Sequence, residues 1–349
     1  MMIFEAFDAD KGDCLLLRCG TALVLVDGGP AGTWSGRLRP ALADMARDMD
    51  GPVRIAMGMV SHVDDDHIRG MLDLFADEAR RREEKSAPLV TFKKFWHNHF
   101  DDIVGGMPAD HSADPATIAS IRQGQELVNA LRVSHGLGNP PFSGLITAGA
   151  QRDFIDIGDG TTVTVAGPLA ARLGELRDDW QAHLREEAVS VVGAEAARLV
   201  DYGATTDTNR SSIVALVRRA GSSILLTGDA RGDDILEGLS MAGVPLPIAV
   251  DILKMPHHGA RHAVTDGFFA QVTARHYVFS FSANGTHGHP DDETIRALVE
   301  SRGPDDEYSL HFTNSHTRVR GTVEALKAGR RFDAVFRDKD KPSIRIALG

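Results

Sequence analysis

The feature that most constrains this chain is a run of histidines and aspartates between a predicted strand and a predicted helix. Apolar residues 55–60 predict the strand, and helical spacing of apolar residues begins after His67. Side chains alternate along an extended segment, so His62, Asp64 and Asp66 can point to one side. Imidazole and carboxylate are ligands of zinc, manganese and iron. Helix capping explains one of these acids but not the two histidines, so the run predicts a metal site.

Three further apolar segments end in residues of the same kinds. Asp229 follows one predicted strand, and His257 and His258 follow the next. His287 and His289 follow a third, where His289 is a candidate proton donor. Each of these alone also fits an ordinary polar turn. Because sites are usually assembled from loops at strand ends, the repeated pattern indicates one site built from several loops.

The charge balance and the cysteines limit the chemistry of this site. With 38 Lys and Arg against 49 Asp and Glu, the net charge is −11, so no broad basic footprint exists for a long phosphate backbone. Long duplex DNA is therefore disfavoured as a partner. Cys14 and Cys19 are the two cysteines and give neither a disulfide framework nor a cysteine zinc site. Any metal must be held by histidine and carboxylate.

The sequence carries no targeting pattern that we can identify. Its first residues include acids where a signal peptide needs a basic start and an apolar core. No apolar stretch approaches the roughly 18 residues that span a bilayer. We expect a cytoplasmic protein without membrane contact.

The order of the predicted elements points to two β-rich layers. Short strands fill the first hundred residues, the last of them over residues 89–96, and a second β-rich block begins at Ser211. Residues 101–150 and 169–199 form elaborated crossover segments with predicted helices. Strands followed by helices, twice over, predict two sheets faced by helices rather than a single parallel sheet.

Seven short motifs occur in order along nearly the whole chain. Together they resemble the metallo-β-lactamase-fold hydrolase superfamily, and within it the soluble hydrolase domain of ComEC-type competence proteins. The chain departs from the superfamily's usual His-x-His-x-Asp-His motif by carrying Asp64 at the second histidine position, as the competence-type branch does. The motifs are Gly12-Asp13, Val26-Asp27-Gly28-Gly29, His62-x-Asp64-x-Asp66-His67, Asn209-Arg210-Ser211-Ser212, Leu226-Thr227-Gly228-Asp229-Ala230, Lys254-x-Pro256-His257-His258-Gly259 and Gly288-His289-Pro290.

The resemblance implies an α/β protein with the αββα four-layer sandwich of the metallo-β-lactamase fold, as one domain over residues 1–349. It also implies two divalent metal ions. We expect zinc, with manganese the alternative, because Asp64 in place of an imidazole makes the first metal position harder. The ligands carried over by motif are His62 and Asp64 for metal 1, Asp66, His67 and His258 for metal 2, and Asp229 as the bridge between them.

One ligand of metal 2 has an alternative at this point. Matching Pro256-His257-His258-Gly259 to the superfamily's Pro-Gly-His-Gly turn selects His258, which leaves His257 as a supporting or substrate contact. The opposite assignment stays open. Asp27, in its Asp-Gly-Gly turn, is expected to hold the metal loop from behind.

The ligand set of metal 1 is incomplete by comparison with the superfamily. Many members supply another histidine between the first motif and the bridging aspartate, but Asn209 and Ser211 stand in that motif here. His97 and His99, at the end of a predicted strand, are candidates for the missing ligand. The other possibility is that metal 1 has no such ligand and is weakly held.

The implied reaction is hydrolysis by a hydroxide that bridges the two metals. Asp66 would orient the hydroxide, and His289 or His287 would protonate the leaving group. Because relatives with the aspartate-substituted motif act on phosphodiesters, we expect a phosphodiesterase or nuclease-like enzyme acting on a small-molecule or short phosphodiester substrate. The alternative is a hydrolase of a carboxylic ester, lactone, thioester or β-lactam on the same centre. The intact ligand set disfavours a metal-free scaffold protein.

Overall fold

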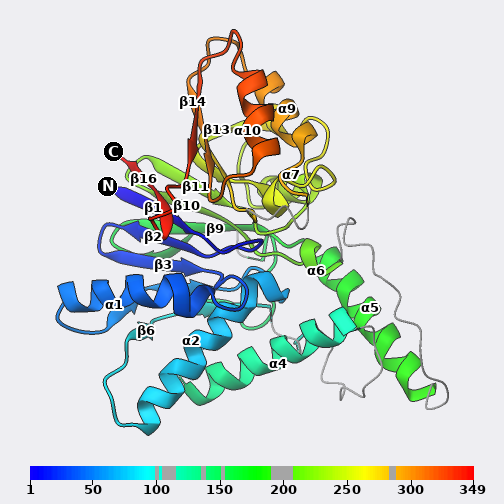
Figure 1. The fold of residues 1–349 in the computed structure, drawn as a ribbon. Helices are drawn as coiled ribbons and strands as arrows, with labels where there is room; N and C mark the ends of the chain where they lie inside the picture. Colours follow the sequence, from blue (N-terminus) through cyan, green and yellow to red (C-terminus); the bar gives the residue numbers. More distant parts are fainter. Residues whose placement is uncertain (99–101, 104–114, 135–138, 151–153, 190–206, 283–287) are drawn as a thin grey trace.

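Two β-sheets form the middle of the molecule, a computed structural model drawn in Figure 1. The structure describes residues 1–98, 102–103, 115–134, 139–150, 154–189, 207–282 and 288–349. In the first sheet β1 lies between β2 and β16, so the two ends of the chain pair side by side in antiparallel order. The strands of this sheet, in spatial order, are β16 (Ser343–Leu348), β1 (Met2–Phe7), β2 (Leu15–Cys19), β3 (Ala22–Val26), β5 (Met57–Met59) and β7 (Phe95–Trp96).

The second sheet is parallel in one part and antiparallel in the other. From β11 to β15 each neighbouring pair is parallel, whereas β8, β9, β10 and β11 run in alternating directions. The carboxyl ends of β11 and β12 therefore meet at one edge, where side chains from both following loops can converge. The strands, in spatial order, are β15 (Phe332–Phe336), β14 (Tyr308–Phe312), β13 (Val272–Phe279), β12 (Ile248–Lys254), β11 (Ser222–Leu226), β10 (Val214–Arg219), β9 (Thr161–Gly167) and β8 (Ile155–Gly158).

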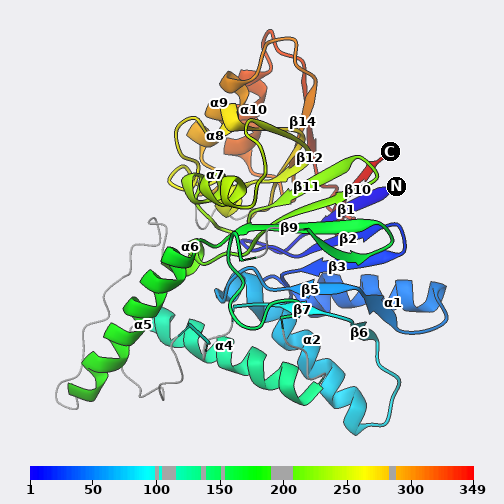
Figure 2. The ribbon, with the colours of Figure 1, turned by 180° about the vertical axis from the view of Figure 1, so that it is seen from behind.

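Helices cover the outer face of each sheet, as the opposite views of Figures 1 and 2 show. One apolar cluster joins the first sheet to its helices, and a second cluster joins the other sheet to its own. A third cluster fills the space between the sheets. The helices on the first sheet are α1 (Arg39–Asp48), α2 (Asp65–Glu83), α4 (Pro115–Ser134) and α5 (Ala170–Val189), and those on the second are α7 (Gly232–Met241), α8 (Phe268–Gln271), α9 (Asp292–Ser301) and α10 (Thr317–Leu326).

The alternation of side chains along the strands explains the layers. Phe4 and Leu17 of the first sheet and Leu226 and Ile252 of the second lie in the cluster between the sheets, all of them buried. Burial of each such side chain contributes about 1.5–3 kcal/mol of hydrophobic free energy. The arrangement confirms the predicted αββα four-layer sandwich. That residues 1–349 form one domain stays a prediction.

Two predicted strands are each divided in the structure. Residues 55–60 and 89–96 each read as one apolar run, but each run contributes to two sheets. The first parts, β4 (Val53–Ile55) and β6 (Val90–Phe92), pair with each other in a separate two-stranded sheet. The second parts, β5 and β7, pair in the first large sheet. Both runs pass from the small sheet to the large one at matching positions. An apolar pattern alone cannot show this division, because it does not identify the strand with which each part pairs.

The N-terminus of α2 is held close to the loop that follows β3. A Cβ atom added to Gly70 would lie 1.9 Å from the carbonyl oxygen of Gly28, and the Gly28 N–H donates to the carbonyl of His67 at 2.7 Å. These contacts fix the start of α2, and the histidine and aspartate run before it, against the first sheet. Among the described helices none is long and apolar enough to cross a membrane.

Candidate metal centre

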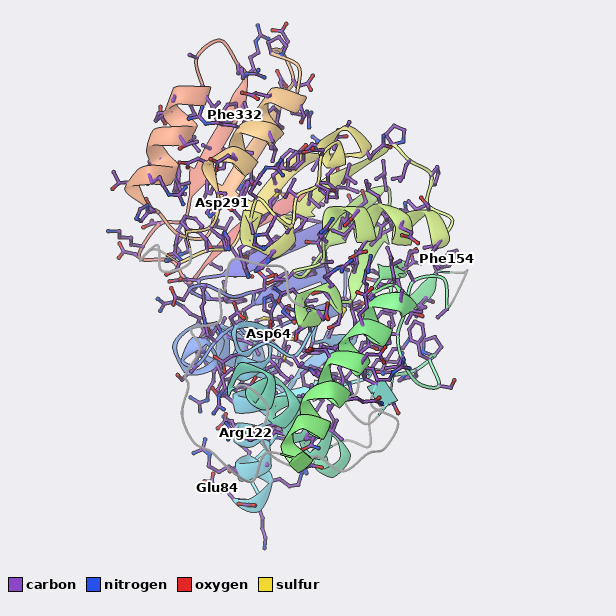
Figure 3. The ribbon with its side chains drawn as sticks, turned by 90° about the vertical axis from the view of Figure 1, so that its right-hand side faces the viewer. Asp64, Glu84, Arg122, Phe154, Asp291 and Phe332 are labelled. Atoms are coloured by element: carbon purple, nitrogen blue, oxygen red, sulfur yellow. The ribbon has the colours of Figure 1, made fainter. Side chains whose placement is uncertain are left out.

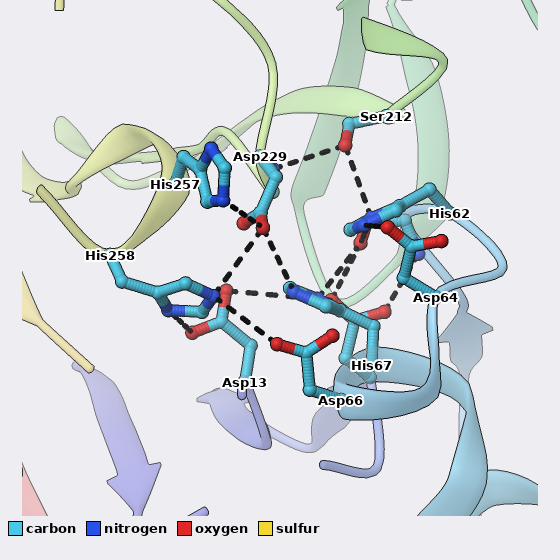
Figure 4. A network of polar contacts seen from close by, with 12 residues as sticks. Asp13, His62, Asp64, Asp66, His67, Ser212, Asp229, His257 and His258 are labelled. Carbon is cyan, nitrogen blue, oxygen red and sulfur yellow. Dashed lines mark hydrogen bonds and ion pairs between the residues drawn. The ribbon is translucent and has the colours of Figure 1, made fainter. Parts of the chain in front are cut away.

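The predicted metal ligands converge where the loops of both sheets meet (Figure 4). The loop after β5 and the first turn of α2 carry four of them, and the loops after β11 and β12 carry one each. Asp13, from the loop between β1 and β2, joins the same group. Figure 3 shows Asp64 at mid-height of the molecule, with Asp291 above it on the same side. The six predicted ligands brought together are His62, Asp64, Asp66, His67, Asp229 and His258.

The distances between ligand atoms are those expected at the edges of a metal coordination shell. Asp229 Oδ2 lies 3.4 Å from His67 Nε2 and 3.4 Å from His258 Nε2. His258 Nε2 lies 3.9 Å from an oxygen of Asp66, and His62 Nε2 lies 3.5 Å from an oxygen of Asp64. Ligands about 2.0–2.2 Å from a common ion lie about 3–3.5 Å apart in a tetrahedral arrangement. Asp229 lies within ion-pair distance of both His67 and His258, and its bridging role stays a prediction.

The rear nitrogens of two ligand histidines are hydrogen-bonded to neighbouring side chains. Asp27 accepts a hydrogen bond at 2.9 Å from Nδ1 of His67, and its other oxygen accepts from the Ser61 N–H at 2.7 Å. Nδ1 of His62 lies 3.1 Å from the hydroxyl of Ser61 and 3.2 Å from that of Ser212. Such contacts fix the ring orientation and leave Nε2 free to bind a metal. Asp27 therefore contacts Ser61 and His67 on the side opposite Nε2 of His67, and its supporting role stays a prediction.

Several buried polar atoms of this group have no hydrogen-bond partner among the described residues. They include Nε2 of His62, His67 and His258, and Oδ1 of Asp229. A buried polar atom left without a partner costs about 1–3 kcal/mol. These atoms come from three separate segments of the chain and lie close together, so a shared ligand would satisfy them together. Their chemistry, imidazole nitrogen and carboxylate oxygen, fits a divalent transition metal.

The charge of the group also favours cations. Lys254 is the nearest permanent cation among the described residues, and it lies 3.9 Å from Asp229 Oδ1. With neutral histidines, the carboxylates of the group outnumber the ammonium of Lys254, so divalent cations would reduce the excess of negative charge. The five carboxylates belong to Asp13, Asp27, Asp64, Asp66 and Asp229.

The electrostatic environment of Asp229 also favours positive charge beside its carboxylate. Burial acts to raise the pKa of Asp229, but the neighbouring histidines His258, His67 and His257 outweigh it and hold the pKa well below its usual value. Burial likewise acts to lower the pKa of His67, yet Asp229 and Asp27 hold that pKa well above its usual value. The centre therefore attracts positive charge.

The turn Pro256–Gly259 has an unusual backbone that separates its two histidines. His257 has φ 43° and His258 has φ 55°, both in the left-handed region that costs roughly 1–2 kcal/mol per non-glycine residue. The turn directs His258 into the group, where it contacts both Asp66 and Asp229. His257 lies beside the group, with Nε2 3.6 Å from Asp229 Oδ2. This placement favours His258 over His257 as the ligand.

A second set of histidines lies at the rim of the centre. His257 Nδ1 is 3.2 Å from His262 Nε2, and the rings of His257 and His289 have centroids 5.4 Å apart. His289 Nδ1 faces Asp291 at 3.4 Å. Burial, together with the neighbouring His258, lowers the pKa of His257 to about 3 although Asp229 acts in the opposite direction, so His257 is neutral at physiological pH. The structure thus places His257 and His289 near the metal centre.

The remaining predicted residues lie beside the centre or outside the described part. His97 and Ser211 line a small cavity next to His62, together with Leu176 and Trp180 of α5. His97 belongs to none of the four groups that could hold a metal among the described residues. Asn209 is buried in the short helix α6 (Asp207–Arg210). Two predicted residues, His99 and His287, lie outside the described residues.

Four residues at the centre carried no predicted role. Asp13 and Lys254 were visible in the motifs, as was Ser212, but nothing in the sequence showed what they contact. His262 had no signal, because its approach to His257 depends on the conformation of the turn between them. All four reach the centre from parts of the chain whose positions only the fold determines.

Comparisons with known proteins give distant similarities. No family model matches the sequence. A stretch of 91 residues, 26% of the chain, is 29% identical to ComE operon protein 3 of Bacillus subtilis (strain 168) and covers 11% of that protein. The chain thus matches about a tenth of the length of this curated relative.

Similar solved structures share little sequence with the chain. Zinc-bound PqqB from Methylobacterium extorquens is 12% identical, with all of both chains covered and a TM-score of 0.42. CmlA, a diiron β-hydroxylase from Streptomyces venezuelae, is 12% identical over 99% of this chain and 54% of its own, with a TM-score of 0.40. A metallo-β-lactamase from Cronobacter sakazakii is 12% identical over 91% and 90%, with a TM-score of 0.30.

Proposed function

We propose that this protein is a metal-dependent hydrolase with a dinuclear centre that cleaves phosphodiesters. The observation that carries the proposal is the convergence of three buried histidine Nε2 atoms on Asp229, without hydrogen-bond partners among the described residues. A purely structural cluster would satisfy these atoms with hydrogen bonds. Residues from both sheets meet here, so a shared metal site explains why their loops are brought together.

The donor atoms support one cation on each side of Asp229. Asp66, His67 and His258 would hold one ion with Asp229, and His62 and Asp64 would hold the other. The mixture of imidazole and carboxylate suits zinc, and the carboxylate of Asp64 makes manganese the alternative for the second ion. When bound, two such cations activate water as a nucleophile and stabilise the charge that develops on the substrate.

The chain's own residues supply the proton transfers. Asp66 is partly exposed beside His258 and is placed to orient the attacking water and accept its proton. His289 is held by Asp291, which orients its ring, and its other nitrogen would donate a proton to the leaving oxygen. His257 and His262, at the same rim, present further nitrogens to a substrate. Asp66 would thus serve the attacking water, and His289 the leaving group.

A phosphodiester is the substrate class that this arrangement supports best. The resemblance of the Asp64 motif to competence-type relatives favours it, and the rim histidines provide donors for phosphoryl oxygens. The net charge of −11 favours a small or short substrate over a long duplex.

The test is hydrolysis by the protein loaded with zinc or manganese. Bis-p-nitrophenyl phosphate, a single-stranded oligonucleotide and a choline-phosphate ester are expected to be cleaved. Asp229→Ala should abolish this cleavage. Asp8→Asn, which removes a carboxylate paired with Arg337 at 2.7 Å, is the matched control and should not. Cleavage of only a lactone, thioester or β-lactam would replace the phosphodiester proposal, and failure to retain any metal would favour a scaffold.

A further inference from the structure

A lysine is buried behind the metal centre. Lys254, the last residue of β12, is fully buried, which is rare for lysine unless its charge is paired. Its Nζ lies 2.5 Å from Asp13 Oδ2 and donates to the carbonyl of Gly228 at 3.4 Å. Asp13 is buried as well. The two residues come from different sheets, so the pair joins the sheets directly beneath the site.

The pair is in contact with the candidate ligands on both sides. Asp13 Oδ1 is 3.7 Å from His258 Nδ1, and Lys254 Nζ is 3.9 Å from Asp229 Oδ1. The Asp13 N–H donates to the carbonyl of Asp66 at 3.3 Å. Asp13 therefore faces Nδ1 of His258 at ion-pair distance, and Nδ1 is also the ring atom through which His67 is hydrogen-bonded to Asp27. A carboxylate in this position orients a ligand histidine and directs its Nε2 lone pair at the metal.

The two supporting carboxylates differ in charge balance. Among the described residues, the Asp27 carboxylate is hydrogen-bonded to Ser61 and His67 and forms no ion pair with a lysine or arginine, so its negative charge adds to that of the centre. The charge of Asp13 is cancelled by Lys254. Without Lys254, the charge of Asp13 would add to the negative charge around the candidate ligands.

We propose that Asp13 and Lys254 form a neutral positioning pair, in which Asp13 aligns His258 and Lys254 cancels the charge of Asp13 beside Asp229. The inference rests on the proposed metal centre but concerns residues that do not themselves bind the metal. It predicts effects of opposite sign for the two residues. Loss of Asp13 leaves an unbalanced positive charge near the cations, whereas loss of Lys254 leaves an unbalanced negative charge.

The experiment measures zinc affinity by competition with a chelator, without substrate. Asp13→Asn is expected to weaken binding at least tenfold, and Lys254→Met to strengthen it at least tenfold. The double variant Asp13→Asn/Lys254→Met restores neutrality at this position. Its zinc affinity is expected to be at least tenfold higher than that of Asp13→Asn alone. Asp8→Asn is the matched control, because it removes another ion-paired carboxylate in the same β1–β2 loop and should leave the affinity within twofold.

The outcomes separate this inference from the proposed function. If the pair only supports the fold, both single variants weaken binding and the double variant is no better than Asp13→Asn, which would overturn the proposal. The comparison of the double variant with Asp13→Asn decides the question even if Lys254→Met alone does not fold. Failure of the wild-type protein to bind zinc or manganese would instead refute the metal centre itself.

Discussion

The two sides of the candidate metal centre are built differently. On one side, which we call the carboxylate-backed half, Asp66, His67 and His258 converge, and carboxylates lie behind both histidines. On the other, the hydroxyl-backed half, His62 and Asp64 have two serine hydroxyls behind the single histidine. A carboxylate raises the basicity of a ligand histidine more than a hydroxyl does. The comparison predicts that two bound ions would be held unequally, with the tighter one in the carboxylate-backed half.

The largest effect is expected from the residue that the halves share. Asp229→Ala removes the carboxylate that lies 3.4 Å from both His67 and His258, so both ions should be lost. Metal content after dialysis, measured by inductively coupled plasma mass spectrometry, should fall to near zero per chain. Asp233→Ala, an exposed carboxylate in the first turn of α7, is the control and should retain metal. Retention of one ion by Asp229→Ala would show that one half binds without a bridge.

A pair of substitutions tests whether the groups behind the histidines make the metal affinities of the two halves unequal. Asp27→Asn, which keeps a residue tolerant of the left-handed backbone at φ 56°, should weaken binding in the carboxylate-backed half by about 10–100-fold. Ser212→Ala removes one of two hydroxyls behind His62 and should weaken the other half by less than about tenfold. A two-step chelator titration measures both affinities. Equal losses would contradict the comparison.

The carboxylate-backed half also depends on a close backbone approach. A Cβ atom added to Gly12 would lie 1.8 Å from the carbonyl oxygen of Asp66, so Gly12→Ala must displace the start of α2. We expect a loss of about 3 kcal/mol in the free energy of unfolding, measured by urea denaturation, and weaker binding of the tighter ion.

Gly321→Ala is the matched control for this substitution. Gly321 lies within α10, and its added Cβ would meet no atom within 4 Å. Alanine there should stabilise the protein by about 0.5–1 kcal/mol. If both variants change the free energy of unfolding alike, close packing at Gly12 does not hold the carboxylate-backed half in place.

A final effect, distant from both halves, sets the pH range in which their metal affinities can be compared. Burial, with a contribution from His276, lowers the pKa of His311 to about 4, below the value of about 6.5 for an unfolded histidine. The unfolded chain therefore binds the proton first, and stability is lost as the pH falls from about 6.5 toward 4, by about 3 kcal/mol in total. Urea denaturation of metal-free protein at several pH values measures this slope. His311→Phe should flatten it, and an unchanged slope would assign the effect to other groups.

The local pattern of the sequence was sufficient for the ligand run and for the two sheets faced by helices. Residues 61–67 combine five potential ligands between a strand and a helix, and no ordinary turn needs that composition. The strands β8 and β9 form a hairpin around Gly158-Asp159-Gly160, whose turn residues and alternating pattern are local features of the sequence. The strands with which these elements pair lie far away in the sequence, so the local pattern could not identify them. The division of residues 55–60 and 89–96 between sheets, and the pairing of β16 with β1, follow from contacts between distant segments.

The sequence by itself determined which side chains could bind metal, because ligand chemistry depends on residue type and short spacing. Only the tertiary structure decided which groups lie behind those ligands. Asp13 and Lys254 are 241 positions apart in the printed sequence, and their ion pair exists because the β1–β2 loop and the end of β12 meet between the sheets. Charge cancellation depends on distance in space, which neither residue type nor spacing along the chain encodes.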